Sequence, residues 1–329
     1  MRVVVTLCTR ERPKLLRACL VSLLGQAVPD SVFFAIVVVE NDATPSSAPI
    51  IAELTATSTV PLTYVHEPRL GIPIARNRAI AAALQYEPEW IGFIDDDEVA
   101  SSNWIAHFLR AAASVEGDVF QGPVEYLHEG AGPTWMPLPR RKHAPTGRPL
   151  RTAATSNTFM RAHIARSDGL ALRFNEAMRF TGGSDNEYFY RAADRGARIC
   201  WMDDAVVLET VPENRTTLTW HLSRAARVAA NSVSIQKNRL GLTRAVAKCA
   251  PKYLARVIGG AGLLPFVVIL SALGLVAAKR LTVSSLCKIA SGVGGLAAFF
   301  YYQPQPYGKN AESDSRIFSG RSEKQGSTL

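Results

Sequence analysis

Short apolar runs alternate with stretches of helical periodicity through the first hundred residues of the chain. Runs typical of buried strands occur at Val3–Leu7, Phe33–Val39, Leu62–Val65 and Trp90–Ile94. Helical spacing of leucines follows Pro13, a residue suited to a helix start, and residues 72–86 form an Ala-rich helical pattern. Strands that alternate with helices predict an α/β fold, with a mostly parallel, Rossmann-like sheet flanked by helices.

Acidic residues follow two of the predicted strands. Glu40 and Asp42 come after the second strand, and Asp95, Asp96 and Asp97 come directly after the fourth. In an open α/β sheet, ligands bind at the carboxyl ends of the strands, so these side chains are expected near one site.

Adjacent carboxylates repel one another, and burying them without a partner is costly. Mg²⁺ or Mn²⁺ removes that cost, and in proteins Mg²⁺ commonly binds one or two carboxylates together with substrate phosphates. The triple aspartate therefore favours a divalent-cation site. The alternative is an acidic helix start, but Ser101 and Ser102 are predicted to supply that cap.

The middle of the chain is less regular. Residues Asp118–Tyr126 predict a further strand, and the Pro-, Gly- and Arg-rich segment Leu127–Leu150 is either a mobile loop over the site or a solvated excursion. Ser184 and Glu187 match a capping box that opens a helix through residue 195. Asp185 then lies in the first helical turn, where an acid is favourable even without a catalytic role.

The positive charge belongs to the C-terminal part of the chain. The net charge is +9, residues 214–311 contain thirteen Lys or Arg and no acid, and the tail after them is neutral, so residues 1–213 carry 9 − 13 = −4. This distribution argues against a nucleic-acid-binding domain. The five cysteines are scattered, so we expect no disulfide framework or zinc site.

Two long apolar stretches lie within residues 257–302, separated by Lys279-Arg280. Each is long enough to cross a hydrocarbon core of about 30 Å, and a basic segment, residues 236–256, precedes them. We expect membrane insertion rather than a buried soluble hairpin. A spanning hairpin would carry Lys279-Arg280 to the far side, against the positive-inside tendency, so re-entrant and one-span arrangements stay open. The tail, residues 303–329, is polar and expected to be disordered.

Five short motifs occur in order along residues 1–235. They are Thr9-Arg10-Glu11-Arg12, Glu40-Asn41-Asp42, Gly71-x4-Arg76-Asn77-x-Ala79, Asp95-Asp96-Asp97 and Gly182-Gly183-Ser184-Asp185. In this order and spacing they resemble family 2 glycosyltransferases of the GT-A fold. The chain is most similar to bacterial exopolysaccharide enzymes of the succinoglycan glucosyltransferase kind.

The resemblance implies an inverting, metal-dependent hexosyltransferase that uses a nucleotide-diphosphate sugar. It implies that Mg²⁺ or Mn²⁺ binds Asp97 and Asp95, the DxD motif, and that Asp185 is the general base. The residues implied for nucleotide-sugar binding are Thr9, Arg12, Glu40, Asp42, Arg76, Asp95 and Asp96. Two departures concern the base: Arg10-Glu11 replaces the usual Tyr-Asn, and Glu40 replaces an Asp. A uridine donor is therefore only the default expectation.

The resemblance and the apolar C-terminal region together define the expected organisation. A catalytic domain, residues 1–235, would face the cytoplasm, held at the inner membrane of a bacterium by the basic juxtamembrane helix 236–256 and the hydrophobic helices of 257–302. The expected partners are the nucleotide-sugar donor, a lipid-linked saccharide acceptor and the membrane itself. Two alternatives stay open: a metal-dependent nucleotidyltransferase, which would release pyrophosphate, and a non-enzymatic membrane scaffold.

Overall fold

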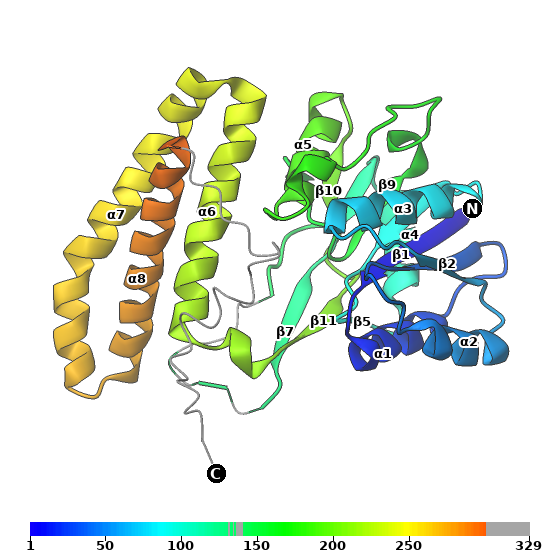
Figure 1. Cartoon of the computed structure of the whole chain (residues 1–329), viewed down its shortest axis with the longest axis horizontal. Helices are drawn as coiled ribbons and strands as arrows, with labels where there is room; N and C mark the ends of the chain where they lie inside the picture. The colour runs from blue at the N-terminus through cyan, green and yellow to red at the C-terminus, as the bar shows by residue number, and fades with distance from the viewer. Residues whose placement is uncertain (131, 134, 136–140, 301–329) are drawn as a thin grey trace, which may run out of the picture.

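The computed structural model describes residues 1–130, 132–133, 135 and 141–300 of the chain. It contains a mixed α/β body (residues 1–211) and, beside it, a layer of three long helices (Figure 1). The predicted tail, residues 303–329, and part of the predicted loop 127–150 lie outside the described residues.

Within the described residues, eight strands form the main sheet in the order β3-β2-β1-β4-β9-β6-β10-β8. The first four are parallel, as predicted, but β9 runs antiparallel to both of its neighbours and β8 runs antiparallel to β10. The strands of this sheet are β1 (Arg2–Thr9), β2 (Phe33–Glu40), β3 (Leu62–His66), β4 (Trp90–Phe93), β6 (Val119–Gln121), β8 (Pro149–Leu150), β9 (Thr158–Arg161) and β10 (Ile199–Trp201).

A second, smaller sheet lies at the carboxyl end of β4. Its strand order is β5-β11-β7, where β11 is antiparallel to β5 and parallel to β7. Its strands are β5 (Glu98–Ala100), β7 (Val124–His128) and β11 (Val207–Val211). In this sheet Glu98 pairs directly with Glu209, which places two acids opposite each other beside the aspartates that follow β4.

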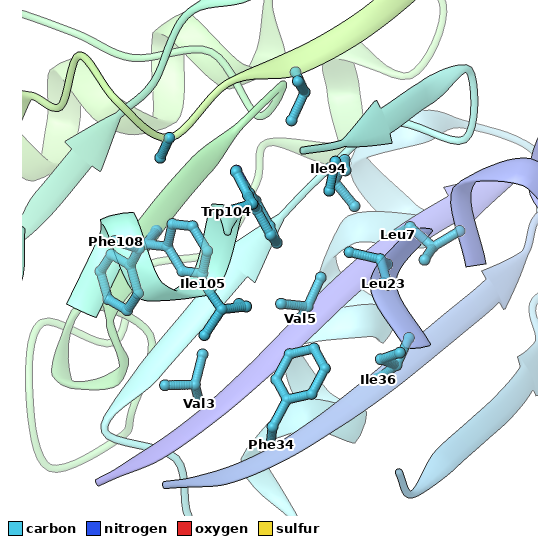
Figure 2. Packing of buried hydrophobic residues seen from close by; sticks show 14 of the residues in the cluster. Val3, Val5, Leu7, Leu23, Phe34, Ile36, Ile94, Trp104, Ile105 and Phe108 are labelled. Carbon is cyan, nitrogen blue, oxygen red and sulfur yellow. The ribbon is translucent and has the colours of Figure 1, made fainter. Parts of the chain in front are cut away.

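Helices cover both faces of the main sheet because side chains alternate along each strand. Val3 and Val5 face one cluster with α1 and α4, shown in Figure 2, whereas Val4 faces the other cluster with α3 and α5. The helices of this body are α1 (Pro13–Leu24), α2 (Ala48–Thr57), α3 (Ile72–Leu84), α4 (Trp104–Ser114) and α5 (Ser184–Asp194), with short 3-10 turns η1 (Ala162–Ile164) and η2 (Glu176–Met178).

The single strand predicted for residues 118–126 is wrong. The chain forms β6, leaves the main sheet at Gly122 and Pro123, and continues as β7 in the second sheet. Proline cannot donate to a strand ladder, and the buried side chain of Asn157 donates to the carbonyl oxygens of Pro123 and Ala205 at 2.8 and 2.6 Å. Apolar alternation alone does not reveal this change of sheet.

Both predicted helix caps are also wrong. The N-cap of α4 is Asn103 rather than Ser101 or Ser102, and it makes no side-chain capping bond. The N-cap of α5 is Gly183, whose left-handed φ of 79° turns the chain into the helix, so Ser184 is already helical. Glu187 consequently does not reach back to the cap, and it pairs with Arg191 one turn later at 2.6 Å.

The C-terminal helices pack as a layer against the mixed α/β body. They are α6 (Leu218–Leu240), α7 (Leu242–Ala272) and α8 (Val276–Ala297), with η3 (Glu213–Arg215) before them and η4 (Ala298–Phe300) after. The apolar part of α7 is continuous with the basic segment before it, and Lys279-Arg280 lies inside α8 rather than between two helices. By length and composition, two helical segments, Leu242–Ala272 and Ala277–Phe300, are long and apolar enough to cross a membrane.

Candidate functional site

The three aspartates lie on a turn that Glu98 holds closed. The Glu98 backbone N–H donates to the Asp95 carbonyl at 3.1 Å, and the Asp95 backbone N–H donates to the Glu98 carboxylate at 2.9 Å. Glu98 is buried at the start of β5, and desolvation together with Asp95 raises its pKa well above the ordinary value. Burial of this carboxyl group fixes the backbone from which Asp95, Asp96 and Asp97 project.

Two arginines neutralise the second and third aspartates. Arg12, just before α1, donates to Asp96 and to Asp97 at 3.1 Å each, and the Thr9 hydroxyl donates to Asp96 at 2.8 Å. Arg215 of η3 lies 3.6 Å from Asp97. The start of the α/β body and the segment just after it therefore meet on this turn, and the binding roles expected of Thr9, Arg12 and the aspartates stay predictions.

Asp95 differs from the two aspartates that follow it. Among the described residues no hydrogen bond reaches its carboxylate, whose nearest cationic partner is Arg76 of α3 at 3.9 Å. Desolvation, followed by Asp97, Asp96 and Asp185 as neighbouring charges, raises the pKa of Asp95 to about 6, and Arg76 opposes this shift. The side chain is still 45% exposed, so this poorly compensated carboxylate is open to a ligand.

Arg76 connects the aspartate turn to the start of α5. Its guanidinium donates to the Ser184 hydroxyl at 3.4 Å and lies 5.7 Å from the centre of the Phe174 ring. Asp185, the next residue, is near enough for its charge to affect Asp95. Among the described residues its carboxylate accepts hydrogen bonds only from the backbone and side-chain nitrogens of Asn186, which leaves acceptor capacity for another group.

Glu40 and Asp42 occupy different surroundings on the other side of β1. Glu40 is fully buried, and its oxygens accept hydrogen bonds from Tyr64 and from the backbone and hydroxyl groups of Ser46 and Ser47. Asp42 accepts from the next backbone N–H and lies 4.0 Å from Arg10. The structure therefore does not bring these acids to the aspartate turn, and their role toward a nucleobase stays a prediction.

Sequence reasoning did not find Arg215 or Glu209. Arg215 lies 3.3 Å from Glu209 of β11, and desolvation followed by the Asp97 charge raises the pKa of Glu209 to about 7. The alternation of residues 207–211 indicates a strand. Its position beside the aspartates depends on the second sheet, and the sequence around Glu209 and Arg215 does not predict that sheet. The lone Arg215 carries no local signal at all.

The fit of a divalent cation depends on how many ligands the protein must supply. Among the described residues there is no group of three or more His, Cys, Asp or Glu side chains arranged to hold a metal. Mg²⁺ with a bound nucleotide usually needs only one or two carboxylates, the rest of its oxygen ligands being phosphates and water. The exposed Asp95 carboxylate, together with Asp97, meets this smaller requirement.

Comparison of the sequence with known proteins gives two matches. Residues 3–178 match the family model described as Glycosyl transferase family 2. The succinoglycan biosynthesis protein ExoM of Rhizobium meliloti (strain 1021) is 31% identical over 226 residues, which cover 67% of this chain and 70% of that protein. The first match includes all but the last of the five motifs.

Comparison of the structure gives similar folds at low sequence identity. Staphylococcus aureus TarS has a TM-score of 0.53 at 17% identity, over 94% of this chain, which spans only 56% of that protein. A shorter TarS structure in complex with UDP-GlcNAc has a TM-score of 0.52 at 15% identity, over 90% of this chain and 91% of that one. The mannosyltransferase PcManGT from Pyrobaculum calidifontis, in complex with GDP-Man and Mn²⁺, has a TM-score of 0.55 at 17% identity, over 89% and 86%. The expected GT-A fold is confirmed.

Proposed function

This chain belongs to glycosyl transferase family 2, and from that premise we propose that it is an inverting glycosyltransferase. It moves a hexose from a nucleoside-diphosphate sugar to a lipid-linked saccharide during the assembly of an exopolysaccharide or another cell-surface polysaccharide. The succinoglycan role in the name of the Rhizobium relative supports the pathway. The nucleotide sugars bound to TarS and PcManGT support the donor class, with uridine as the default base.

The observation that carries this proposal is the position of Arg76. It reaches Asp95 on one side at 3.9 Å and Ser184 on the other at 3.4 Å, so the aspartate turn lies close to the start of α5, where Asp185 follows Ser184. The charge of Asp185 acts on Asp95. A displacement at a sugar carbon needs two functions together: carboxylates that hold a cation for the donor phosphates, and a base for the acceptor hydroxyl.

The proposed reaction is a single displacement. The acceptor hydroxyl attacks the anomeric carbon from the face opposite the nucleotide, the bond to the diphosphate breaks, and Asp185 takes the hydroxyl proton. Asp95 and Asp97 would hold Mg²⁺ or Mn²⁺, which supplies charge neutralisation of the leaving diphosphate when it is bound. The Mn²⁺ in the PcManGT complex supports this choice of cofactor.

Arg12 and Arg215 have a second role in this proposal. Without donor they neutralise Asp97, to which Arg12 donates at 3.1 Å and from which Arg215 lies 3.6 Å away. With Asp97 holding a cation, the guanidinium groups of Arg12 and Arg215 would be available to the donor diphosphate, whose geometry suits arginine. The contact with Glu209 would keep Arg215 at the site when its other partner is the donor diphosphate in place of Asp97.

We place the enzyme at the inner membrane of a bacterium, with the catalytic domain on the cytoplasmic side. The apolar, outward-facing surfaces of α7 and α8 support membrane attachment, and the acid-free composition of residues 214–311 supports contact with anionic lipid. In this arrangement a lipid-linked acceptor diffuses in the same membrane that holds the enzyme. The proposed limits of the regions are 1–235 for the catalytic domain, 236–256 for the basic segment and 257–302 for the membrane helices.

Product analysis tests the reaction. Membranes that contain the full chain should convert a nucleotide sugar and a lipid extract into a nucleoside diphosphate and a glycosylated lipid, and EDTA should stop both. Inversion is checked by NMR of the anomeric proton in the product. Release of pyrophosphate in place of nucleoside diphosphate would indicate a nucleotidyltransferase, and full activity in EDTA would contradict the metal assignment.

A further inference from the structure

Helix α6 lies between the α7–α8 hairpin and the mixed α/β body (Figure 1). On one face, a Cβ atom on Gly294 of α8 would meet the Ala226 backbone at 2.4 Å, so the two helices are in direct backbone contact. On the other face, the Asn231 side chain donates to the Thr181 carbonyl at 2.7 Å, and Arg239 pairs with Asp194 of α5. The side of the hairpin that faces α6 is therefore covered by protein, so lipid cannot surround the hairpin at this level, although Leu254 and Ile258 on the other side of α7 are exposed.

Only the turn end of the hairpin extends beyond α6. Ala226 lies beside Gly294, and α6 begins eight residues earlier at Leu218, so α6 ends near the level of Ser285 and Ile289, which contact Gly260. Beyond that level α7 and α8 contact only each other among the described helices, as the buried Val267 and Ala278 show. Residues 261–272 of α7 rise about 18 Å beyond it, and residues 276–284 of α8 about 14 Å, at ~1.5 Å per residue. A hydrocarbon core is about 30 Å thick, so this free end is too short to cross it.

The surface of the hairpin changes character along its length. On the free end of α7 the outward side chains are large and apolar; Phe266 is 69% exposed and Leu273 is 72% exposed. The first half of α7 also exposes apolar residues such as Val246 and Leu254, but there they are interspersed with the exposed Arg244, Lys248 and Lys252. An apolar end next to a basic end matches the acyl chains and the anionic headgroups of a single leaflet.

The charges just after the turn give the orientation. Lys279 is exposed on the first turns of α8, close to the turn at residues 273–275. A hairpin that entered along the membrane normal would carry this charge deep into hydrocarbon, which is costly. A shallow angle leaves the ammonium group in the headgroup layer while the neighbouring leucines enter the acyl chains.

We propose that the α7–α8 hairpin is a monotopic anchor, which enters only the leaflet nearest the α/β body, at a shallow angle, and does not cross the membrane. Lys279 and the basic residues of α7 then remain in the headgroup layer on the side of the α/β body. The inference rests on the membrane attachment of the proposed function, but it does not depend on the transfer reaction. A spanning hairpin would place Lys279-Arg280 on the far side of the membrane, against the positive-inside tendency; the anchor keeps them on the side of the α/β body.

The test uses the native full chain and compares two lysines. Closed membrane vesicles are treated with a membrane-impermeant sulfonated succinimidyl ester, and modified peptides are identified by mass spectrometry. Lys14 on α1 is exposed and reports the side of the α/β body. The anchor predicts that Lys279 is modified whenever Lys14 is modified, in intact vesicles. Modification of Lys279 only after the vesicles are opened, while Lys14 reacts before, would overturn the proposal.

Two substitutions test the surface that enters the leaflet. Phe266→Asp should weaken binding of the purified protein to phosphatidylethanolamine–phosphatidylglycerol vesicles by about tenfold or more. Val228→Asp is the matched control, because Val228 is also an exposed apolar residue, 53% exposed, but lies on α6. Equal losses in both variants, or wild-type protein that does not bind these vesicles, would also overturn the proposal.

These outcomes are separable from failure of the proposed function. Donor binding and nucleoside-diphosphate release are measured on the same preparations, in detergent, where the anchor has no role. An inactive protein with co-labelled Lys14 and Lys279 would contradict the transferase and leave the anchor intact. An active protein in which Lys279 is modified only after the vesicles are opened would contradict the anchor and leave the transferase intact.

Discussion

Glu40 at the end of β2 and Asp95 after β4 lie on either side of β1, yet their surroundings are opposite. Desolvation alone would raise the pKa of Glu40, but hydrogen bonds from Tyr64, Ser46 and Ser47 outweigh it and lower that pKa to about 2. Desolvation also dominates at Asp95, where no hydrogen bond compensates it, and the pKa rises to about 6. The first carboxylate has its partners within the protein, whereas the second lacks them and is suited to receive them from a ligand.

This difference separates an acid that supports the fold from an acid that is suited to bind a ligand. Both follow predicted strands and both belong to motifs that suggest ligand contact, so sequence position does not distinguish them. The distinction comes from the donors that the fold brings to each one. Substitution of Glu40 should therefore lower the stability of the fold, whereas substitution of Asp95 should raise it.

The largest effect on stability is expected for Glu40→Ala. The variant removes a fully buried acceptor of several hydrogen bonds, and a pKa lowered from 4.5 to about 2 corresponds to roughly 3 kcal/mol of unfolding free energy at pH 7. Because the folded pKa is depressed, this stability is present above the unfolded pKa and is lost as pH falls toward 2. Thermal unfolding at pH 7 and at low pH measures it. Glu40→Gln keeps one acceptor oxygen and should lie between Ala and wild type; an unaltered Tm for the Ala variant would disprove the structural role.

Glu209→Gln should act in the opposite direction and depend on pH. The folded pKa of Glu209 is about 7, above its unfolded value, so the folded state favours the neutral carboxyl group. The destabilisation is absent below the unfolded pKa of 4.5, grows as pH rises from there toward the folded pKa of about 7, and is complete above it. We expect the variant to be more stable than wild type by about 1–2 kcal/mol at pH 8.5, after allowance for partial solvent screening, and nearly equal to it at about pH 4. A gain of the same size at both pH values would show that the charge is not the cause.

Asp95→Asn should raise stability slightly and abolish donor binding. The substitution removes a charge that its surroundings disfavour, but the side chain is 45% exposed, so the gain is about 1 kcal/mol or less. This corresponds to about 2–4 °C or less in Tm. Differential scanning calorimetry and donor titration on one sample check both halves of the prediction. A variant that is less stable than wild type would remove the contrast with Glu40.

Glu187→Gln should have the smallest effect. In the structure Glu187 serves an ion pair with Arg191 one turn away rather than a capping box, and such pairs contribute about 0.2–0.5 kcal/mol. Turnover should stay near the wild-type value, because neither residue contacts the aspartate turn. The variant is therefore the control for substitutions at neighbouring Asp185. A large loss of activity would mean that Glu187 contacts substrate.

The sequence predicts best where a local pattern decides the structure. The first four strands and α1 and α3 follow from apolar periodicity, and the aspartate turn follows from acids placed after a buried strand. It predicts poorly where distant segments decide: β9 inserts antiparallel between β4 and β6, and β7 leaves the main sheet after Pro123. Arg215 could not be found for the same reason, because only the second sheet and η3 bring it to Asp97.

The predicted N-cap of α5 is wrong for a different physical reason. The capping-box pattern is a local preference, but Gly183 in a left-handed conformation already turns the chain, so α5 begins one residue earlier than the pattern requires. Glu187 then lies where Arg191 is a better partner than a distant backbone N–H. The sequence Gly183-Ser184-x-x-Glu187 fits both a glycine turn and a capping box. In the structure the left-handed glycine begins the helix, and the capping box does not form.

The central claim is that Asp97 acts on the donor and its cation whereas Asp185 acts on the acceptor proton. The most direct measurement is donor affinity and single-turnover rate, side by side, for Asp97→Asn, Asp185→Asn and the Glu187→Gln control. Asp185→Asn should keep donor affinity and lower the rate by about 10²–10⁴-fold, the usual share of general-base catalysis, whereas Asp97→Asn should weaken donor binding as well. If Asp185→Asn turns over normally while Glu187→Gln is inactive, or if Asp97→Asn binds donor as tightly as wild type, the roles assigned to these carboxylates are wrong.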